Sequence, residues 1–362
     1  MSNVEEIKSL FFKLLSVNGI SGFEEPMIKT LMEELEPLCD EVYQTPRGNV
    51  IGVQHGTDPD APKVALAAHT DQVGFIVFSI DERGFLRFRK IGGSVTGSIQ
   101  GHQMKVHGKK GPVMGVAGIK PGHMTKPSEA NTIPPIEQLY IDIGALSREE
   151  VYEMGIEVGT PITWNTGPAE LANNFVATAA ADDRAGLTAI ITVAKNLKDK
   201  PIPATVYYIG TIEEEIGLRG AEVALFDLDV DMAVAIDTCP SGYQPDVKPV
   251  DIVYEVGKGP ALQVAEAGSR GIRISSRVPR EWIAETAEKH DLPYQRGIMY
   301  GGTDASAMQQ TKSGVPAVPF SIPRRYSHSP VELLSLDDLY HLTEILTHGL
   351  SELDSSFKFL RV

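Results

Sequence analysis

Histidine and carboxylate side chains follow three apolar, strand-like runs of this sequence. His69 comes directly after VALAA, Glu215 ends VYYIGTIEEE, and Asp237 lies in MAVAIDT. In an open α/β sheet, functional sites form outside the carboxyl ends of the strands. The three side chains therefore predict one site to which several strands contribute.

Two further motifs carry side chains of the same chemistry. Asp182 and Asp183 open an expected helix in AADDRAG, and His328 lies in the polar sequence SHSP. Taken alone, the paired aspartates have an ordinary explanation as helix caps, and the glutamates at 213–215 as a solvated turn before a helix. Taken together, these imidazoles and carboxylates, without a cysteine, suit catalytic zinc, cobalt or manganese rather than a structural zinc site.

The candidate side chains are as many as a hydrolytic centre with two metal ions requires. Such a centre, with ions ~3.5–4 Å apart, needs one shared ligand, terminal ligands on each ion and a free carboxylate that takes a proton from the bridging water. The candidate side chains supply all of these parts. The residue types by themselves leave open which side chain has which part and which ion is native.

Alternating elements surround these motifs and must position them. Apolar spacing predicts helices over 4–17 and 24–37, a hairpin over 41–55 and a strand over 63–68. Later in the chain the expected elements are a helix over 184–198, a strand over 204–212, a helix over 218–226 and a strand over 231–237. This alternation predicts an α/β fold, with a mostly parallel sheet and helices on both faces.

The segment from Gly74 to about Trp164 has a different pattern. Short alternating runs such as FIVFSI and FLRFRKI are separated by glycines and charged turns, with little helical spacing. This pattern predicts a small all-β domain inserted into the α/β domain. We therefore expect a discontinuous catalytic domain, residues 1–72 and 165–362, and an inserted β domain, residues 73–164.

Composition restricts the partners and the compartment. The 362-residue chain has a formal net charge of -15 and scattered basic residues, whereas nucleic-acid binding needs a basic face. The first residues lack the pattern of a signal peptide, and no segment holds ~18 uninterrupted apolar residues. Cys39 and Cys239 are too few for a disulfide framework. We expect a cytoplasmic protein without a nucleic-acid or membrane partner.

Eight short motifs, in order along essentially the whole chain, resemble one known family: the tetrahedral (TET) or glutamyl aminopeptidases, the cellulase-M-like branch of the dinuclear metallopeptidases. The motifs are SGFE at 21–24, AHTDQVGF at 68–75, IDIGA at 141–145, ADDRAG at 181–186, EEEIGLRGA at 213–221, AIDT at 235–238, GGTDA at 301–305 and YSHSPVE at 326–332. The resemblance implies a zinc-exopeptidase-like fold and removal of N-terminal residues from short peptides. It also implies two divalent ions per subunit, zinc, cobalt or manganese.

The resemblance also implies a part for each metal ligand. Asp182 bridges the two ions, His69 and Asp237 complete one of them, and Glu215 and His328 complete the other. Assembly follows from the same resemblance, since the family forms dimers that build tetrahedral dodecamers, with the β domain involved in contacts and access.

The remaining site residues are carried over in the same way. Glu214 matches the general base, and Asp71 matches the carboxylate that fixes the ring of a metal-bound histidine. The family has a cis peptide bond between the two aspartates of ADDRAG. Within GGTDA, three residues are expected to line the substrate site: Gly302, Thr303 and Asp304.

Two positions depart from the family pattern, and other functions stay open. Gln72 stands where glutamate is usual, and Glu213 stands where an uncharged or amide residue is usual, which makes the choice among three glutamates less secure. The main alternative is a dinuclear deacylase or carboxypeptidase of the same fold. A metal-free scaffold would not require the complete ligand set, and a glycosidase would give no reason for the two histidines.

Overall fold

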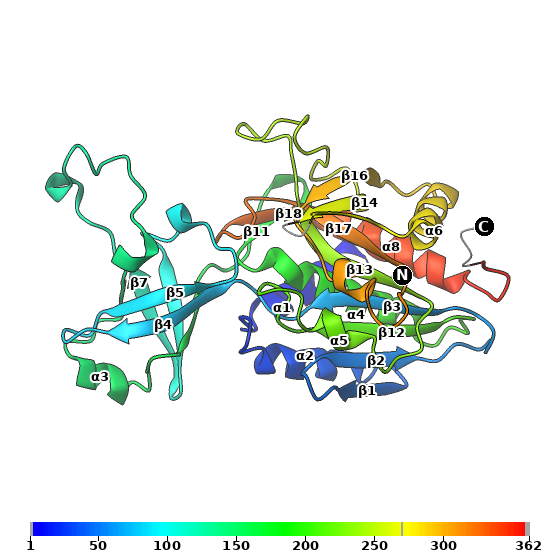
Figure 1. Cartoon of the computed structure of the whole chain (residues 1–362), viewed down its shortest axis with the longest axis horizontal. Helices are drawn as coiled ribbons and strands as arrows, with labels where there is room; N and C mark the ends of the chain where they lie inside the picture. Colours follow the sequence, from blue (N-terminus) through cyan, green and yellow to red (C-terminus); the bar gives the residue numbers. More distant parts are fainter. Residues whose placement is uncertain (1–2, 269–270, 359–362) are drawn as a thin grey trace.

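The structure of the chain, a computed structural model, describes residues 3–268 and 271–358. Two bodies are visible in Figure 1: β4, β5, β7 and α3 lie apart from a larger body that holds the other labelled elements. No helix within the described residues combines the length and the apolar character that a membrane span requires.

The elements have the following bounds. The helices are α1 (Val4–Leu15), α2 (Glu25–Leu35), α3 (Arg148–Glu153), α4 (Ala181–Leu197), α5 (Ala221–Ala224), α6 (Arg277–Lys289), α7 (Ala305–Met308) and α8 (Leu336–Ser351). The strands of the larger body are β1 (Glu41–Gln44), β2 (Val50–Gln54), β3 (Lys63–His69), β10 (Ala169–Glu170), β11 (Phe175–Thr178), β12 (Thr205–Thr211), β13 (Met232–Pro240), β14 (Ala261–Gly268), β15 (Gly271–Ile274), β16 (Gln295–Tyr300), β17 (Ala317–Arg325) and β18 (Glu332–Ser335). The strands of the smaller body are β4 (Gly74–Ile80), β5 (Leu86–Ile91), β6 (Gln103–Gly108), β7 (Gly111–Ala117), β8 (Ile141–Asp142) and β9 (Pro161–Trp164).

The larger body is built on one mixed sheet. Its strand order is β1-β2-β12-β3-β13-β17-β18-β11-β10. In addition, β14 pairs with β17, with β15 and with β16. The four central strands β12, β3, β13 and β17 are parallel, whereas the flanking pairs are mainly antiparallel. The expected α/β class is confirmed, with the parallel arrangement confined mainly to the middle of the sheet.

Helices cover both faces of this sheet, as predicted. On one face α1, α2, α4, α6 and α8 share a single apolar cluster with the sheet, and nearly every side chain of α4 is buried. On the other face α5 and α7 pack against strands β3 and β13 through a second cluster. A helix buried on all sides is typical of the core of a large domain, which explains why α4 is apolar around most of its surface.

Parallel pairing brings the polar motifs to one edge of the sheet. Thr211 at the end of β12 is paired with His69 at the end of β3, and Asp237 in β13 is paired with Ser321 in β17. Because parallel strands share a direction, residues that follow their carboxyl ends gather at the same edge. The predicted convergence of the three strand-end motifs is therefore present in the fold.

The smaller body is a closed barrel of antiparallel strands in the order β4-β5-β8-β7-β6-β9. Aromatic rings fill its interior, with Phe75 edge-on to Phe88 at 5.3 Å and to Trp164 at 5.0 Å between ring centroids. Edge-to-face pairs of this kind add to the stabilisation that burial provides. The barrel strands lie between Gly74 and Trp164, and sheet strands precede and follow them in the chain.

One predicted helix is much shorter than expected. The helix predicted over 218–226 is the four-residue α5, because the preceding segment makes a tight irregular loop. Glu213 and Leu218 have φ values of 52° and 61°, in the left-handed region that side chains rarely adopt. Hydrogen bonds from Leu218 N–H to Glu214 O and from Gly220 N–H to Ile212 O hold this loop at the sheet edge.

Candidate metal centre

Asp182 lies between two histidines at the carboxyl edge of the sheet. Its Oδ1 is 3.1 Å from Nε2 of His69, and its Oδ2 is 3.3 Å from Nε2 of His328. The same His328 nitrogen is 3.4 Å from Oε2 of Glu215. One carboxylate thus presents one oxygen to each histidine, and ligand atoms of His69, Asp182 and Glu215 also lie within 4.8 Å of one another.

Asp237 and Asp183 lie on the His69 side of this cluster. One ligand atom each from His69, Asp183 and Asp237 falls within 4.8 Å of the others. Asp183, however, already accepts hydrogen bonds from the backbone N–H of Gly186 at 2.8 Å and of His69 at 3.3 Å. Both oxygens of Asp183 thus accept backbone N–H groups, and Asp183 joins the start of α4 to β3, whereas Asp237 accepts one such bond, from Thr238 to its Oδ1. Asp237 stays the predicted terminal ligand on this side.

The bond between Asp182 and Asp183 is cis, as the resemblance implied. Residue 180 precedes it in a left-handed conformation. Asp183 makes a cap bond, since its Oδ1 accepts the backbone N–H of Gly186, three residues later, at 2.8 Å. The simple helix-cap explanation of the two aspartates is therefore wrong for Asp182, whose carboxylate faces the histidines instead.

The donor atoms suit a pair of divalent ions. Glu215 Oε1 is buried and has no hydrogen-bond partner among the described residues. An unpaired carboxylate oxygen in a buried place costs free energy unless a cation or a donor meets it. The set of imidazole nitrogens and carboxylate oxygens contains no thiolate, and it fits zinc, cobalt or manganese.

Backbone hydrogen bonds hold the three consecutive glutamates in place. The N–H groups of Glu214 and Glu215 donate to the two oxygens of Asp71, at 3.0 and 3.1 Å, and the N–H of Glu213 donates to Glu24 at 3.1 Å. Asp71 Oδ1 also lies 3.4 Å from Nδ1 of His69. Asp71 therefore connects the histidine at the end of β3 to the glutamate loop after β12.

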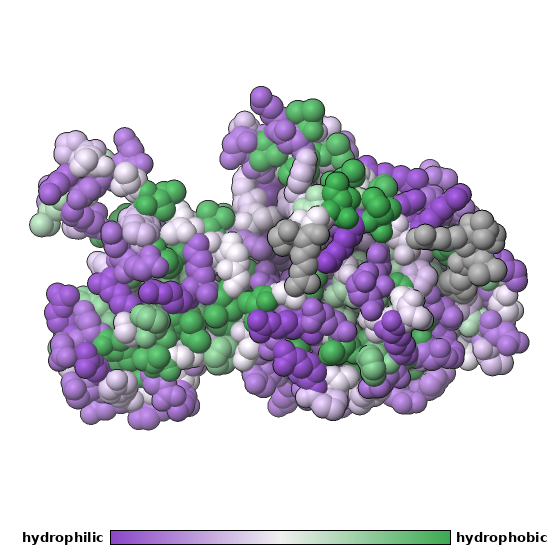
Figure 2. Space-filling view, viewed as in Figure 1, coloured by the Kyte–Doolittle hydropathy of each residue, from purple (hydrophilic) through white to green (hydrophobic). Residues whose placement is uncertain are grey.

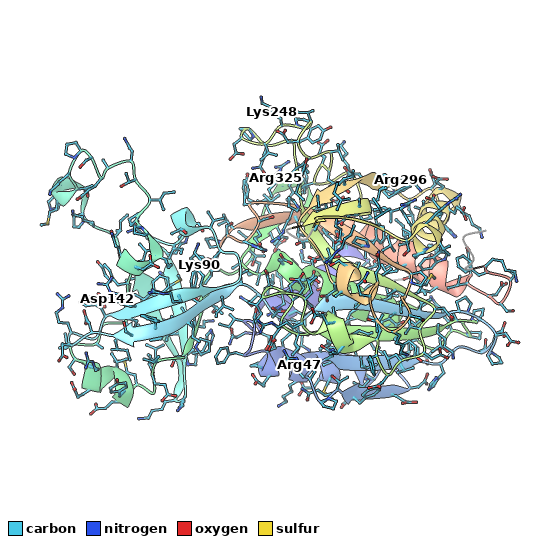
Figure 3. All side chains as sticks on the ribbon, viewed as in Figure 1. Arg47, Lys90, Asp142, Lys248, Arg296 and Arg325 are labelled. Carbon is cyan, nitrogen blue, oxygen red and sulfur yellow. The ribbon has the colours of Figure 1, made fainter. Side chains whose placement is uncertain are left out.

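The side chain of Glu213 points away from this centre. Its Oε2 is 2.6 Å from Nη2 of Arg47 and 3.6 Å from Nη1 of Arg219. Figure 3 shows Arg47 on the larger body, on the side of β1 and α2. Glu214 and Glu215, by contrast, line the cavity that contains the candidate ligands. The geometry separates the three glutamates, which the sequence alone left uncertain.

The surroundings raise the pKa of Glu214 and lower the pKa of Asp182. Burial raises the pKa of Glu214 well above its ordinary value, and the adjacent Glu215 adds to the effect. Burial also opposes ionisation of Asp182, but Arg324, His328 and His69 outweigh it and hold the pKa of Asp182 well below the ordinary value. The surroundings of Asp182 thus favour its charged form, whereas burial and the adjacent Glu215 favour the protonated form of Glu214.

Sequence reasoning missed two buried residues of the site. Arg324 donates to Asp182 Oδ2 at 2.5 Å and forms an ion pair with Glu332, which also accepts the N–H of Asp182 at 3.1 Å and of His328 at 2.7 Å. Glu332 ends the motif YSHSPVE, so the motif contained this residue without indicating its contacts. Arg324, two positions before that motif, carried no comparable signal.

The GGTDA motif lies partly on the cavity and partly behind it. Gly302 lines the cavity, whereas Thr303 and Asp304 are almost fully buried. The hydroxyl of Thr211 donates to Asp304. Direct substrate contact thus stays a prediction for Gly302, and the geometry gives the other two residues a supporting position.

Gln72, the first departure from the family pattern, accepts a hydrogen bond from the fully buried Arg184. The distance from Nη2 of Arg184 to Oε1 of Gln72 is 2.9 Å, and Nη1 donates to the carbonyl of Thr70 at 2.8 Å. Gln72 thus contacts the buried side chain of Arg184. It is absent from the residues that line the cavity.

The chain matches a known family over most of its length. The pattern of the M42 glutamyl aminopeptidase family covers residues 48–345. The chain belongs to this family. The lysyl aminopeptidase of Pyrococcus furiosus is 35% identical to this M42 chain, over 95% of it and 96% of the relative.

Solved structures agree with this placement. An aminopeptidase from the archaeon Desulfurococcus kamchatkensis has a TM-score of 0.92 with the M42 chain at 33% identity, and the match covers 99% of each. The TET1 peptidase of Pyrococcus horikoshii, which can assemble into a tetrahedron or a large octahedral shell, has a TM-score of 0.84 at 30% identity, over 97% of the M42 chain and 100% of that structure. The M42 chain is accordingly a metal-dependent aminopeptidase, and the predicted resemblance is confirmed.

Proposed function

We propose that this chain removes N-terminal residues from short peptides at two divalent ions, with Glu214 as general base. The observation that carries the proposal is the position of Asp182, whose two oxygens lie 3.1 Å from Nε2 of His69 and 3.3 Å from Nε2 of His328. His69, Asp182 and Asp237 would hold one ion. Asp182, Glu215 and His328 would hold the other.

The side chains then divide the chemistry. When bound, the ions polarise the scissile carbonyl and lower the pKa of the attacking water toward neutrality. Glu214, with Oε2 4.0 Å from Nε2 of His69, would take a proton from that water and later return it to the leaving amine. Asp71 keeps Glu214 and His69 in a fixed relation through its bonds to both.

Substrate preference separates this proposal from a deacylase or carboxypeptidase of the same fold. An aminopeptidase requires a free N-terminal amine, whereas a deacylase accepts an acylated one. A panel of aminoacyl p-nitroanilides and short peptides, each with and without N-terminal acetylation, tests the difference.

The same panel tests the metal requirement. Chelation should abolish hydrolysis, and zinc, cobalt or manganese should restore it for unblocked substrates only. Cleavage of acetylated substrates alone would support the deacylase, and activity that survives complete chelation would overturn the two-metal mechanism. The metal that restores the highest kcat/KM identifies the preferred ion.

The chain also has a surface suited to self-association, and we propose that dimers assemble into a tetrahedral dodecamer. Four large apolar side chains at the outer edge of the sheet are at least half exposed: Ile272, Ile274, Ile298 and Tyr300. Figure 2 shows apolar side chains gathered where β14 and β16 lie in Figure 1. Exposed patches of this kind mark protein contacts.

Light scattering after gel filtration measures the assembly, and a monomer at micromolar concentration would contradict it. A contact and access role of the β domain, and the cytoplasmic location, stay predictions.

A further inference from the structure

The wall of the cavity away from the candidate ligands is a small piece of sheet. Glu266 in β14 is paired with Arg273 in β15 on one side and with Met299 in β16 on the other. Paired residues of neighbouring strands point to the same face, and all three side chains line the cavity. Glu266 is the middle of a row of three side chains.

Glycines leave the space between this row and the metal ligands open. Gly268, Gly271, Gly301 and Gly302 line the cavity, whose volume is about 440 Å³. A Cβ atom added at Gly271 or Gly302 would meet no atom of the described residues within 4 Å. Any side chain at these positions would therefore extend into open space. A long substrate side chain entering from the metal centre has room to reach the row.

Glu266 is a rigidly held charge at the bottom of this space. Its side chain is 3% exposed, and its Oε1 accepts the backbone N–H of Thr303 at 2.7 Å. Within the described residues it forms no ion pair, and burial raises its pKa to about 7, with Arg273 lowering it less than burial raises it. A buried carboxylate that lacks a cation is stabilised by any cation that reaches it.

Arg273 is the competing charge on this wall. It is only partly buried, and among the described residues it makes neither a hydrogen bond nor an ion pair. Water and salt screen a partly exposed charge, so its effect on a bound ligand is smaller than that of a desolvated charge held in a sheet. Arg324, the other arginine among the described residues that line the cavity, is already paired with Asp182 and Glu332.

We propose that Glu266 determines specificity by binding the cationic end of a lysine or arginine side chain at the substrate N-terminus. The inference rests on the proposed aminopeptidase function and specifies its substrate class. In this role the Glu266 carboxylate, which lines the cavity, pairs with the substrate ammonium or guanidinium. Thr303, in the GGTDA motif, then acts as the residue that holds this carboxylate, rather than as a direct substrate contact.

Glu266→Gln is the variant that tests this role. Glutamine keeps the shape of the side chain and an oxygen that accepts the Thr303 N–H, but it removes the charge. In the metal-loaded protein, kcat/KM would be measured for p-nitroanilides of lysine, arginine, methionine and glutamate. The wild type should prefer lysine and arginine. In the variant, the ratio of kcat/KM for lysine to kcat/KM for methionine should fall about ten- to a hundredfold, which is the scale of one charged hydrogen bond. The kcat/KM for methionine itself should stay within about threefold of the wild-type value.

Arg273→Gln is the matched control on the neighbouring strand. It removes the competing cation, so it should leave the preference for lysine unchanged or raise it. Calorimetry with lysinamide and methioninamide, at equal metal content, provides a binding measurement that does not depend on turnover. Glu266→Gln should weaken lysinamide binding selectively.

Three results would overturn the inference. One is a wild-type preference for glutamate that Arg273→Gln removes, and another is a wild-type preference for methionine over lysine. The third is an equal loss on all substrates in Glu266→Gln, which would assign Glu266 to holding Thr303 only. In all three cases unblocked substrates are still cleaved, so the proposed function stands. Absence of hydrolysis with every substrate and metal would instead contradict the proposed function.

Discussion

The sheet edge and the barrel bury different kinds of side chain. In the larger body, buried charged residues gather around Asp182 and include Asp71, Asp237, Arg324 and Glu332. In the barrel segment 73–164, all of which the structure describes, the buried polar side chains are Ser94, Thr160 and Thr163, and no carboxylate is buried. The larger body therefore buries a cluster of charged groups, whereas the barrel segment buries no carboxylate.

This difference has a physical reason. Burying a charge is unfavourable unless partners meet it, and each partner at the sheet edge is held by a bond to another residue. Asp71 alone accepts the N–H groups of Glu214 and Glu215 and the hydroxyl of Ser21. The barrel instead relies on apolar packing around Phe75 and Trp164. Chemistry is therefore expected from the sheet edge, and stability and contacts from the barrel.

The largest expected effect is loss of turnover at the sheet edge. Glu214→Gln removes the proton acceptor but leaves the five ligands, so kcat should fall by a factor on the order of 10³ to 10⁵ with the metal content unchanged. Steady-state kinetics together with elemental analysis of the purified protein measures both quantities. Full activity in this variant would show that another group takes the proton.

Asp182→Ala provides the contrast to that variant. It removes the carboxylate whose oxygens lie 3.1 Å from Nε2 of His69 and 3.3 Å from Nε2 of His328, so it should lower the metal content itself and not turnover alone. Retention of two metal equivalents in Asp182→Ala would contradict the bridging role.

A large-to-small substitution in the barrel tests whether the two bodies are independent. Phe75→Ala removes a fully buried ring and should lower the free energy of unfolding of the barrel by about 3 to 5 kcal/mol. Metal content and hydrolysis of a small p-nitroanilide should stay near the wild-type values below the unfolding transition. Differential scanning calorimetry and metal analysis measure the two properties.

Phe78→Ala is the matched control, because Phe78 lies on the same strand but is 53% exposed. This variant should change the free energy of unfolding by less than about 1 kcal/mol. If Phe75→Ala lost its metals at the same temperature at which the barrel unfolds, the two bodies would unfold as one unit. They would then differ in the side chains that they bury but not in their stability.

The smallest expected effect is a pH dependence of stability that originates in the barrel. Burial, with a contribution from Lys105, lowers the pKa of His107 from its ordinary value of 6.5 to about 4. Between these two values the unfolded chain binds more protons than the folded chain, so the free energy of unfolding decreases as the pH falls from 6.5 to 4. His107→Gln should make this decrease less steep.

Urea unfolding of the wild type and the variant at matched metal concentration, between pH 4 and 7, measures the difference. His123→Gln, at an exposed position of the same body, should follow the wild type. Identical slopes for wild type and His107→Gln would show that the buried imidazole does not contribute.

Much of the fold was predictable because its signals are local. Apolar spacing placed helices close to α1, α2 and α4 and strands close to β3, β12 and β13. The helix predicted over 218–226 was too long, since the left-handed residues Glu213 and Leu218 depend on contacts with distant segments. The antiparallel flanks of the sheet were likewise outside what spacing indicates, because spacing does not specify a strand's neighbour.

The sequence by itself determined which side chains are available for metal chemistry, their order along the chain and the family to which they belong. Tertiary structure decided which of them meet. Arg47 directs Glu213 away from the centre, Asp183 is occupied by backbone N–H groups, and Arg324 reaches Asp182 from 142 positions away. Such contacts depend on strand order and register, which join segments that are remote in sequence. The chemistry of a side chain limits the partners that it can bind. The fold selects among these partners by bringing only some of them within a few ångströms.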